Sequence, residues 1–482
     1  MDQSERFTPK WRFIQEVSLA INHQLSTIIF LFSMKPIPLL PLDAEISRRA
    51  LFRYGILTTA AMMLGEKTGF ALPAASSAPQ SKAQAVIQIW LWGGPCHIDT
   101  FDPKPDAGRD YTGPLNEAIA TNADGIRLIK LLPNLAKQAD KFSLIRSMTH
   151  GNNGHETAAY MVQSGHPDGE RLVYPSMGAV VSLLKGYDAG YKGLLPPYIV
   201  LTEAQGRFSE AGFLGPRYKP FATGGDPART PFAVEGIVAE GISPEHQTLR
   251  RDLLGQLDTL GKRFEGDPQF AEYRKSGEAA YDMILGEGAE VFNLAKESDE
   301  LRNSYGRNTF GQSCLAARRL VERGAKYVTI NYKGWDTHKN HFPTMNRKLP
   351  ELDQGIATLL QDLSDHGLLG STIVWCEGEF GRTPRVQWEA PWNGGRGHYG
   401  KVFSALVAGG GFQGGHVVGS SDARGEEVAA RPVYPWDLTA SMFELLGIDP
   451  DSTFPRKDDK SVRLTPKITG NIKSGGRLKE IM

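Results

Sequence analysis

Cysteine is scarce in this sequence, with three among 482 residues. Cys96, Cys314 and Cys376 form no CxxC pair, which excludes a disulfide scaffold and a zinc knuckle. Net charge is missing as well, because 54 Lys and Arg residues balance 54 Asp and Glu residues. Proteins that bind nucleic acid carry a clear basic excess, so we expect no nucleic-acid partner.

Long apolar runs are also absent from the part of the sequence that should form the mature protein. Residues 54–64 are too few to span a bilayer as a helix. The run STIIFLF, residues 26–32, lies ahead of the expected start of the protein. We therefore expect no stable membrane anchor in the mature chain, and nothing in the sequence indicates an oligomeric state.

The segment 47–83 has the order of an export signal, in which an arginine pair precedes an apolar stretch and a small-residue tail. The pair Arg48-Arg49 resembles the twin-arginine signal. The alternative is an ordinary helix with two exposed arginines. Twin-arginine export carries folded proteins, often loaded with a cofactor, so a metal is worth looking for.

The boundaries of this leader follow from the late position of the arginine pair. We assign residues 1–82 to a leader and signal region, in which 1–33 precede a true start at Met34. The mature protein is then expected in the periplasm or outside the cell.

Glycine is abundant, at 53 residues, which suits a loop-rich α/β enzyme. Short apolar runs predict strands at 85–92, 142–146, 197–202, 327–332, 371–376 and 403–408. Amphipathic stretches predict helices at 128–139, from about His155, at 349–366 and at 438–446. This alternation predicts a mostly parallel central sheet with helices on both faces.

Two stretches interrupt the alternation. Residues 203–229 are rich in Gly, Pro and Arg and should form a loop, whereas 244–319 are charged and periodic and should form helices. We divide the chain after the leader into one domain, 83–470, with a helical insertion at 231–320 and a C-terminal tail at 471–482.

Polar residues gather where the predicted strands end. Ligands of parallel α/β sheets bind beyond the carboxyl ends of the strands, so these residues should meet. The five groups, in chain order, are His97, Asp99 and Asp102; His150 and His155; Asp336, His338 and His341; Glu377, Glu379 and Arg382; and His398.

Histidine and carboxylate side chains are ligands of zinc, manganese or iron, and a set of this size could hold two ions. A single histidine is more often a capping or core residue. Five groups at strand ends favour a metal site. Arg382, Arg385 and Arg396 would suit a tetrahedral oxyanion. The alternative for Glu379 and Arg382 is a surface ion pair, which contributes little.

Four motifs, GGPCHIDTFDPKP, GWDTHKN, GEFGRTP and GRGHYG, together resemble the DUF1501 family, a usually exported branch of the alkaline phosphatase and sulfatase superfamily. Residues 349–383 are similar to the helix, strand and metal-binding turn of that superfamily. The resemblance covers roughly 83–455. It implies a three-layer α/β/α alkaline phosphatase-like fold and hydrolysis of phosphate or sulfate esters at a metal centre.

The resemblance also implies roles for individual residues. The superfamily has a Ser, Thr or Cys nucleophile at the start of a helix, and His155 occupies that position. Glu379 takes the place of a ligand Asp, but Phe380 takes the place of the next ligand. The remaining implied ligands are Asp336, its displaced partner His338, the final histidine His398, and His97 or Asp99 after the first strand.

Three roles remain open for His155: a metal ligand, a nucleophile or general base, or a capping residue in a site that no longer catalyses. We favour the ligand or base, because the positive end of a helix lowers the basicity of an imidazole and keeps it neutral. Cys96 is a rival nucleophile, although the sequence shows no Asn or Asp to orient it.

We therefore predict an exported hydrolase of phosphate or sulfate esters that uses metal-activated water. One or two divalent ions, zinc or manganese before calcium, would be held by His97, Asp99, Asp336, His338, Glu379 and His398. His155 and Arg382 would be catalytic, and Arg382, Arg396 and His150 would contact the anionic substrate. The alternative is a non-catalytic relative that binds an anionic glycan or a partner protein in the same cleft.

Overall fold

The structure is a computed structural model that describes residues 81–169, 172–203, 210–234, 246, 249, 287–455, 461–468 and 472–482. The predicted signal with Arg48 and Arg49 and the predicted start at Met34 lie outside these ranges, as do residues 235–245, 247–248 and 250–286 of the predicted insertion. Within these ranges, no helix is both long and apolar enough to cross a membrane.

An eight-stranded sheet forms the centre of the molecule, in the order β12-β4-β11-β8-β1-β7-β5-β6. Every residue of β1, β5, β8 and β11 is buried, which explains why these strands are mostly apolar. The strands are β1 (Ala85–Trp90), β4 (Phe142–Met148), β5 (Tyr198–Leu201), β6 (Phe221–Ala222), β7 (Tyr327–Asn331), β8 (Thr372–Glu377), β11 (Phe403–Ala408) and β12 (Val417–Val418).

One strand of the described sheet runs against the others. β1 pairs in parallel with β7 and β8, and β5 pairs in parallel with β6 and β7. β11 pairs antiparallel with both of its neighbours, β4 and β8. The start of β11 therefore lies at the same edge of the sheet as the ends of β4 and β8.

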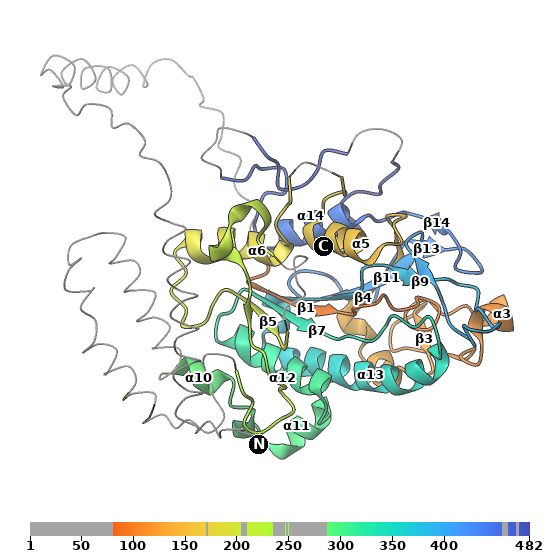
Figure 1. Ribbon diagram of the computed structural model, residues 1–482, viewed down its shortest axis with the longest axis horizontal. Helices are drawn as coiled ribbons and strands as arrows, with labels where there is room; N and C mark the ends of the chain where they lie inside the picture. The colour runs from red at the N-terminus through yellow and green to blue at the C-terminus, as the bar shows by residue number, and fades with distance from the viewer. Residues whose placement is uncertain are drawn as a thin grey trace, which may run out of the picture. The chain divides into compact units, whose positions relative to one another are not determined.

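Helices cover both faces of the sheet, as Figure 1 shows. On one face α12 packs against β1 and β7, and α13 packs against α12. On the other face α5 packs against α14, and α6 against β5 and β7. The helices are α3 (Arg109–Thr112), α4 (Pro133–Ala136), α5 (His155–Ser164), α6 (Met177–Val181), α10 (Glu287–Val291), α11 (Asp299–Tyr305), α12 (Thr309–Glu322), α13 (His341–Asp365) and α14 (Pro435–Leu445).

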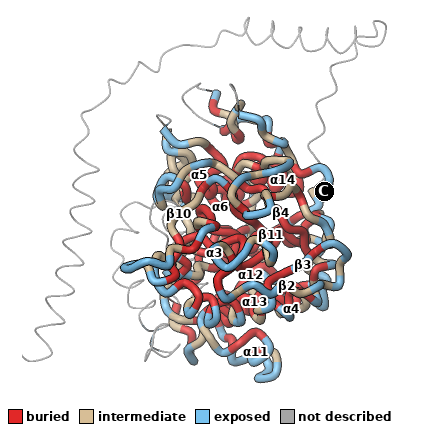
Figure 2. Tube along the Cα trace, turned by 90° about the vertical axis from the view of Figure 1, so that its right-hand side faces the viewer, coloured by how far each residue is buried: buried red, intermediate tan, exposed pale blue. Residues whose placement is uncertain are grey.

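Two hydrophobic clusters, one on each face of the sheet, form the core. Figure 2 shows buried residues along the sheet and on the inner sides of the helices. Leu478 and Ile481, near the end of the chain, are buried in the second cluster. The predicted α/β class, with a mostly parallel sheet between two helical layers, is confirmed.

In the described part of the chain, three antiparallel strand pairs lie outside the central sheet. They are β2 (Ala118–Ala120) with β3 (Arg127–Ile129), β9 (Gly381–Arg382) with β10 (His398–Tyr399), and β13 (Ser420–Ser421) with β14 (Val428–Ala430). The hairpin of β9 and β10 pairs Arg382 with His398. It therefore joins two of the polar groups that the sequence singled out.

The six predicted strands are present, but two predicted helices differ. The helix predicted at 128–139 is wrong: residues 127–129 pair with β2, and only the single turn α4 is helical. Pro133 is the reason, because proline has no N–H to donate and is favoured at the first turn of a helix. The helix predicted at 349–366 begins two turns earlier, at His341, and contains Pro350.

A buried carboxylate joins two helices beneath the sheet. Asp353 on α13 is 1 % exposed and accepts hydrogen bonds from the backbone N–H groups of Asn134 (3.0 Å) and Leu135 (2.7 Å). Its Oδ2 also accepts from the Asn134 side chain at 2.8 Å. These bonds satisfy amide groups at the start of α4 that have no partner within the helix.

We expect Asp353→Ala to lower the free energy of unfolding by about 2–4 kcal/mol, because it leaves the buried N–H of Leu135 unpaired and removes two part-buried hydrogen bonds to Asn134. Asp365→Ala, at the exposed end of the same helix, should change it by less than about 0.5 kcal/mol. Urea denaturation followed by circular dichroism measures both. Equal losses in the two variants would show that the Asp353 contacts do not stabilise the fold.

Candidate metal centre

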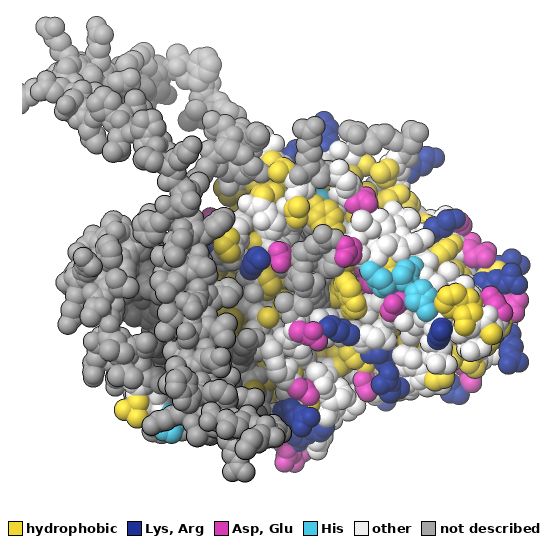
Figure 3. Space-filling model, in the orientation of Figure 1, with side chains coloured by type: hydrophobic (Ala, Val, Ile, Leu, Met, Phe, Trp, Pro, Cys, Tyr) yellow, Lys and Arg dark blue, Asp and Glu magenta, His cyan; other side chains and the backbone are white. Residues whose placement is uncertain are grey.

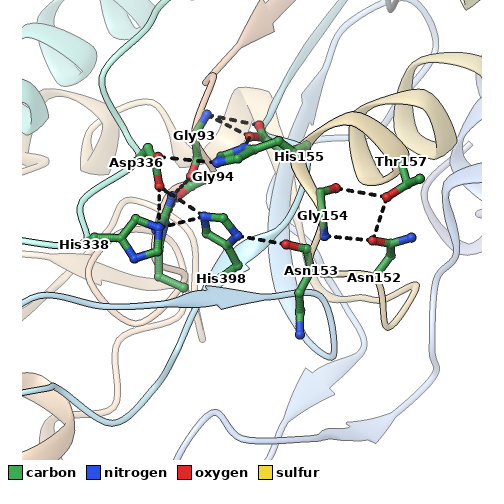
Figure 4. Close-up of polar contacts among 12 residues, drawn as sticks. Gly93, Gly94, Asn152, Asn153, Gly154, His155, Thr157, Asp336, His338 and His398 are labelled. Carbon is green, nitrogen blue, oxygen red and sulfur yellow. Dashed lines mark hydrogen bonds and ion pairs between the residues drawn. The ribbon is translucent and has the colours of Figure 1, made fainter.

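Four side chains meet at the carboxyl edge of the sheet, and we call them the histidine cluster: His155, Asp336, His338 and His398 (Figure 4). One ligand atom each from His155, Asp336 and His398 lie within 4.8 Å of one another. His338 joins through its Nε2, which lies 2.8 Å from His398 Nε2 and 3.1 Å from Asp336 Oδ1. We predicted from the sequence that these residues at the strand ends would meet, and they lie together in the structure.

The sheet topology explains how distant parts of the chain reach this edge. His155 follows β4, and Asp336 and His338 follow β7, at the ends of strands that run in one direction. His398 precedes β11 instead. Because β11 runs in the opposite direction, the residues before it lie at the same edge as those after the other strands.

His155 is the first residue of α5 and lies between two carboxylates. Its Nδ1 donates to Glu379 Oε1 at 2.6 Å, and its Nε2 lies 3.4 Å from Asp336 Oδ2. Hydrogen bonds to Asp336 and Glu379 raise the pKa of His155 to about 9. We expected the helix terminus to lower its basicity, but the two carboxylates outweigh the helix dipole.

Glu379 is buried, and its position explains how the imidazole of His155 is oriented. Both carboxylate oxygens accept from the backbone N–H of Gly93, at 3.0 and 3.1 Å, and one of them also accepts from His155. The carboxylate therefore orients the imidazole through its Nδ1, on the side of the ring that faces away from Asp336. It leaves His155 Nε2 facing Asp336.

Asp336 is the exposed centre of the cluster, with 42 % of its side chain accessible. Burial opposes its ionisation, but hydrogen bonds from His155, His398 and Arg382 hold the pKa of Asp336 far below its usual range. Its Oδ1 lies 3.2 Å from His398 Nε2 and also accepts from Arg382 Nη2. Asp336 is therefore a carboxylate at any physiological pH.

The tautomer of His398 follows from a backbone partner. Its Nδ1 lies 2.8 Å from the carbonyl oxygen of Asn153, which can only accept, so Nδ1 carries the hydrogen. In the neutral imidazole, Nε2 then carries the lone pair and faces Asp336 and His338, whereas in the protonated ring Nε2 donates to Asp336 Oδ1. A backbone carbonyl that orients a ligand histidine is common at metal sites.

The loop before α5 is shaped by Asn152 and Gly154. Asn152 Oδ1 accepts from the N–H of Gly154 at 2.8 Å and from Thr157 Oγ1 at 2.9 Å (Figure 4). The N-cap of α5 is Gly154, with no side-chain capping bond, so Asn152 shapes the loop ahead of the helix and His155 is not its capping residue. The imidazole of His155 is available for other chemistry.

His150 lies beside the cluster but is occupied by backbone groups. Its Nδ1 accepts from the N–H of Asn152 at 3.0 Å, and its Nε2 donates to the carbonyl of Glu379 at 2.7 Å. Burial lowers the pKa of His150 to about 4, so it is neutral. It joins the loop after β4 to the loop after β8, and the contact with substrate that we predicted stays a prediction.

Of the three arginines that the sequence analysis suggested for an oxyanion, Arg382 and Arg396 are fully buried, whereas Arg385 is exposed and lies 3.6 Å from Asp110. Arg382 donates to the carbonyls of Gly93, Gly94 and Arg396 and to the carboxylate of Asp336. Arg396 donates to the carbonyls of Thr383, Pro384 and Tyr111 and forms an ion pair with Asp99 at 2.8 Å. In this structure both guanidinium groups support loops and lie beneath the surface.

His97 and Asp99 are not brought to the histidine cluster. Asp99 is fully buried between His341 Nε2, at 2.7 Å, and Arg396. His97 is also buried and contacts the carbonyl of Gly425 at 2.9 Å. Burial raises the pKa of the neighbouring Cys96 thiol to about 12, which makes it a poor nucleophile. We leave these residues out of the proposed metal centre.

A cavity of about 760 Å³ lies elsewhere, lined by residues of α4, α11 and α13 and by none of the histidine cluster. Its walls carry no histidine. The convergence of ligand atoms, rather than the size of a cavity, therefore locates the candidate site.

A family model described as "Protein of unknown function (DUF1501)" matches residues 83–473. The chain belongs to the DUF1501 family. The resemblance that we predicted from four short motifs is thereby confirmed. A search of curated proteins finds no match to this DUF1501 protein.

Solved structures similar to this DUF1501 protein are distant in sequence. The lipoteichoic acid synthase LtaP from Listeria monocytogenes is 9 % identical, with 81 % of this chain and 76 % of that chain covered and a TM-score of 0.36. A protein of the alkaline phosphatase superfamily from Vibrio parahaemolyticus is 12 % identical, with 77 % and 68 % covered and a TM-score of 0.36. The PsFucS1 sulfatase from Pseudoalteromonas sp. is 12 % identical, with 84 % and 72 % covered and a TM-score of 0.31. Similarity at this level carries no argument about substrate or mechanism.

Two glycines in the site loops of this DUF1501 protein allow a matched test. Gly93 has a φ of +110°, and a Cβ atom there would lie 2.1 Å from the backbone N of Asp336. Gly151 also has a positive φ, +75°, but a Cβ atom there would meet nothing within 4 Å. An alanine at either position would therefore adopt a strained, positive φ, but only at position 93 would its Cβ atom also clash with a neighbour.

We expect Gly93→Ala to destabilise the fold by about 3 kcal/mol or more and to displace Asp336, whereas Gly151→Ala should cost about 1–2 kcal/mol. Urea denaturation gives the two free energies. A loss for Gly93→Ala that merely equals that for Gly151→Ala would mean that the close approach of the two loops is not needed.

Proposed function

We propose that this DUF1501 protein is a metal-dependent hydrolase of phosphate or sulfate esters. The metal would be held by His155, Asp336 and His398, with His338 as a further ligand. The observation that carries the proposal is the convergence of one imidazole nitrogen each from His155 and His398 and one carboxylate oxygen of Asp336 within 4.8 Å, with His338 in contact with two of the three groups.

The atoms that would bind the metal suit a divalent ion. His155 and His398 each use Nδ1 as a donor to a fixed acceptor, so each Nε2 carries a lone pair when the imidazole is neutral. Lone pairs and a carboxylate that face one another repel unless a proton or a cation lies between them. The raised pKa of His155 reflects the same preference for positive charge at this point.

The ligand types favour zinc or manganese over calcium. Calcium takes six to eight oxygen ligands, whereas this site offers mainly imidazole nitrogen. A divalent ion bound here would polarise an ester oxygen and lower the pKa of a bound water.

The chain's own residues would hold these ligands in place. Glu379 orients His155, and the carbonyl of Asn153 orients His398, in the arrangement that raises the basicity of ligand histidines. Arg382 fixes Asp336 from below. We propose this positioning role for Arg382 and Glu379 in place of direct contact with the anion or the metal, because both side chains are buried and committed to other partners.

Metal content tests the proposal directly. We expect the purified protein to hold about one zinc or manganese ion per chain, measured by inductively coupled plasma mass spectrometry after dialysis. His398→Ala should weaken binding at least about 100-fold, because it removes a ligand. Glu379→Gln should weaken it by about 10- to 100-fold, because it alters the partner of His155 and leaves every ligand atom in place.

His366→Ala is the control for this test, since His366 lies just after α13 with its ring against Asp362 and is distant in the chain from all four cluster residues. Its metal content should equal that of the wild type. A wild-type protein that holds no metal after incubation with zinc and manganese would rule out the proposed hydrolase. Metal-loaded protein would next be assayed on phosphate and sulfate esters, because a protein that binds esters without turnover would fit the non-catalytic alternative.

We also propose, on the sequence alone, that the protein leaves the cytoplasm through the twin-arginine route. The double variant Arg48→Lys and Arg49→Lys should accumulate inside the cell, as measured by fractionation and immunoblotting. Arg53→Lys, which keeps the pair, is the control. Unchanged export of the double variant would contradict the assignment.

A further inference from the structure

Aromatic side chains border the histidine cluster on two sides. Trp92 follows β1, is half-buried, and stacks on His155 with ring centroids 5.8 Å apart and an interplanar angle of 20°. Trp392 lies in the loop between β9 and β10, with its ring 6.1 Å from that of His338. Figure 3 shows the histidines as a patch at the surface with hydrophobic side chains on either side.

The loop that carries Trp392 is held firmly against the cluster. Gln387 and Gly395 form an antiparallel bridge, and the N–H of Arg396 donates to the carbonyl of Thr337 at 3.1 Å. A Cβ atom at Gly395 would lie 1.8 Å from the carbonyl oxygen of His338, so only glycine allows this approach. The position of Trp392 beside His338 is therefore built into the backbone.

The two tryptophans of this loop, Trp388 and Trp392, differ in how fully their rings pack against other parts of the protein. Trp388 is 41 % exposed but stacks on Phe342, with centroids 5.7 Å apart and an interplanar angle of 22°. Among the described residues, the one ring neighbour found for Trp392 is His338. An indole that is only partly covered and lies beside candidate metal ligands is suited to contact a bound molecule.

Charge is a poor candidate for recognising the organic part of a substrate here. The guanidinium groups of Arg382 and Arg396 are buried and bound to backbone carbonyls and carboxylates. At the surface, the cluster is bordered by the edge or face of two indole rings, Trp92 and Trp392. Indole faces bind flat apolar surfaces, such as the C–H face of a sugar ring or an arene.

We infer that the protein acts on esters whose alcohol is a ring with a flat apolar face, and that Trp392 is the residue that selects them. This inference rests on the proposed function, because it assumes that the ester group lies at the histidine cluster. The ring of the alcohol would lie against Trp392 next to His338. Trp92 would border the other side and would mainly hold the imidazole of His155.

The test compares small and ring-shaped esters on the zinc-loaded full protein. Methyl phosphate, phenyl phosphate and glucose 6-phosphate, with their sulfate counterparts, are the probes. Calorimetry at low temperature gives Kd, and release of phosphate or sulfate gives kcat/KM. We expect ring esters to be preferred over methyl esters about five- to tenfold, and Trp392→Ala to abolish this preference while it changes the methyl esters less than about twofold.

Trp388→Ala is the matched control, because it removes an indole from the same loop that stacks on Phe342. It should leave the preference intact. A preference for glucose 6-phosphate alone would assign a sugar ester, one for phenyl phosphate alone an aryl ester, and one for both the shared ring face. If Trp392→Ala affects methyl and ring esters equally, or neither, the inference is overturned and the hydrolase proposal stands. If the wild type neither binds nor cleaves any of these esters, methyl or ring-shaped, the hydrolase proposal itself fails.

Discussion

The buried carboxylate of Glu379 is the contact on which the site depends. Burying a carboxylate away from water costs several kcal/mol of folding free energy unless it is fully hydrogen-bonded. Removing one partner of a buried ion pair costs about 3–5 kcal/mol. Here the partners come from two other parts of the chain, the backbone of Gly93 and the imidazole of His155. One buried charge thus fixes the loop after β1, the start of α5 and the turn after β8 relative to one another.

Arg382 plays the complementary part. It is a buried cation that also binds the carbonyl of Gly93, and it carries Asp336 on its outer side. Glu379 and Arg382 therefore both bind the backbone of Gly93 in the loop after β1. Through their other bonds they orient His155 and Asp336 toward the same point. Only the outer residues of this arrangement reach solvent, which is the position that ligands of a metal need.

The sequence was informative about the sheet and about which loops would meet, because apolar runs and strand ends follow from local pattern. It could not separate Asp99 from Asp336, since both follow a strand. The side chain of Asp99 is directed to buried His341 and Arg396, and that depends on tertiary packing. The backbone carbonyl of Asn153 that orients His398 has no signature in the sequence. The Asn-Gly character of residues 152–154 indicated only a loop.

Charge balance connects the buried frame to the proposed chemistry. With neutral imidazoles, the carboxylates of Glu379 and Asp336 exceed the single charge of Arg382 by one, so the site favours one further positive charge. A proton on His155 can supply it, and the hydrogen bonds to Asp336 and Glu379 accordingly raise the pKa of His155 to about 9. A divalent ion in its place would make the site net positive. The cluster would then attract an anionic ester, although both nearby arginines are buried and committed to the frame.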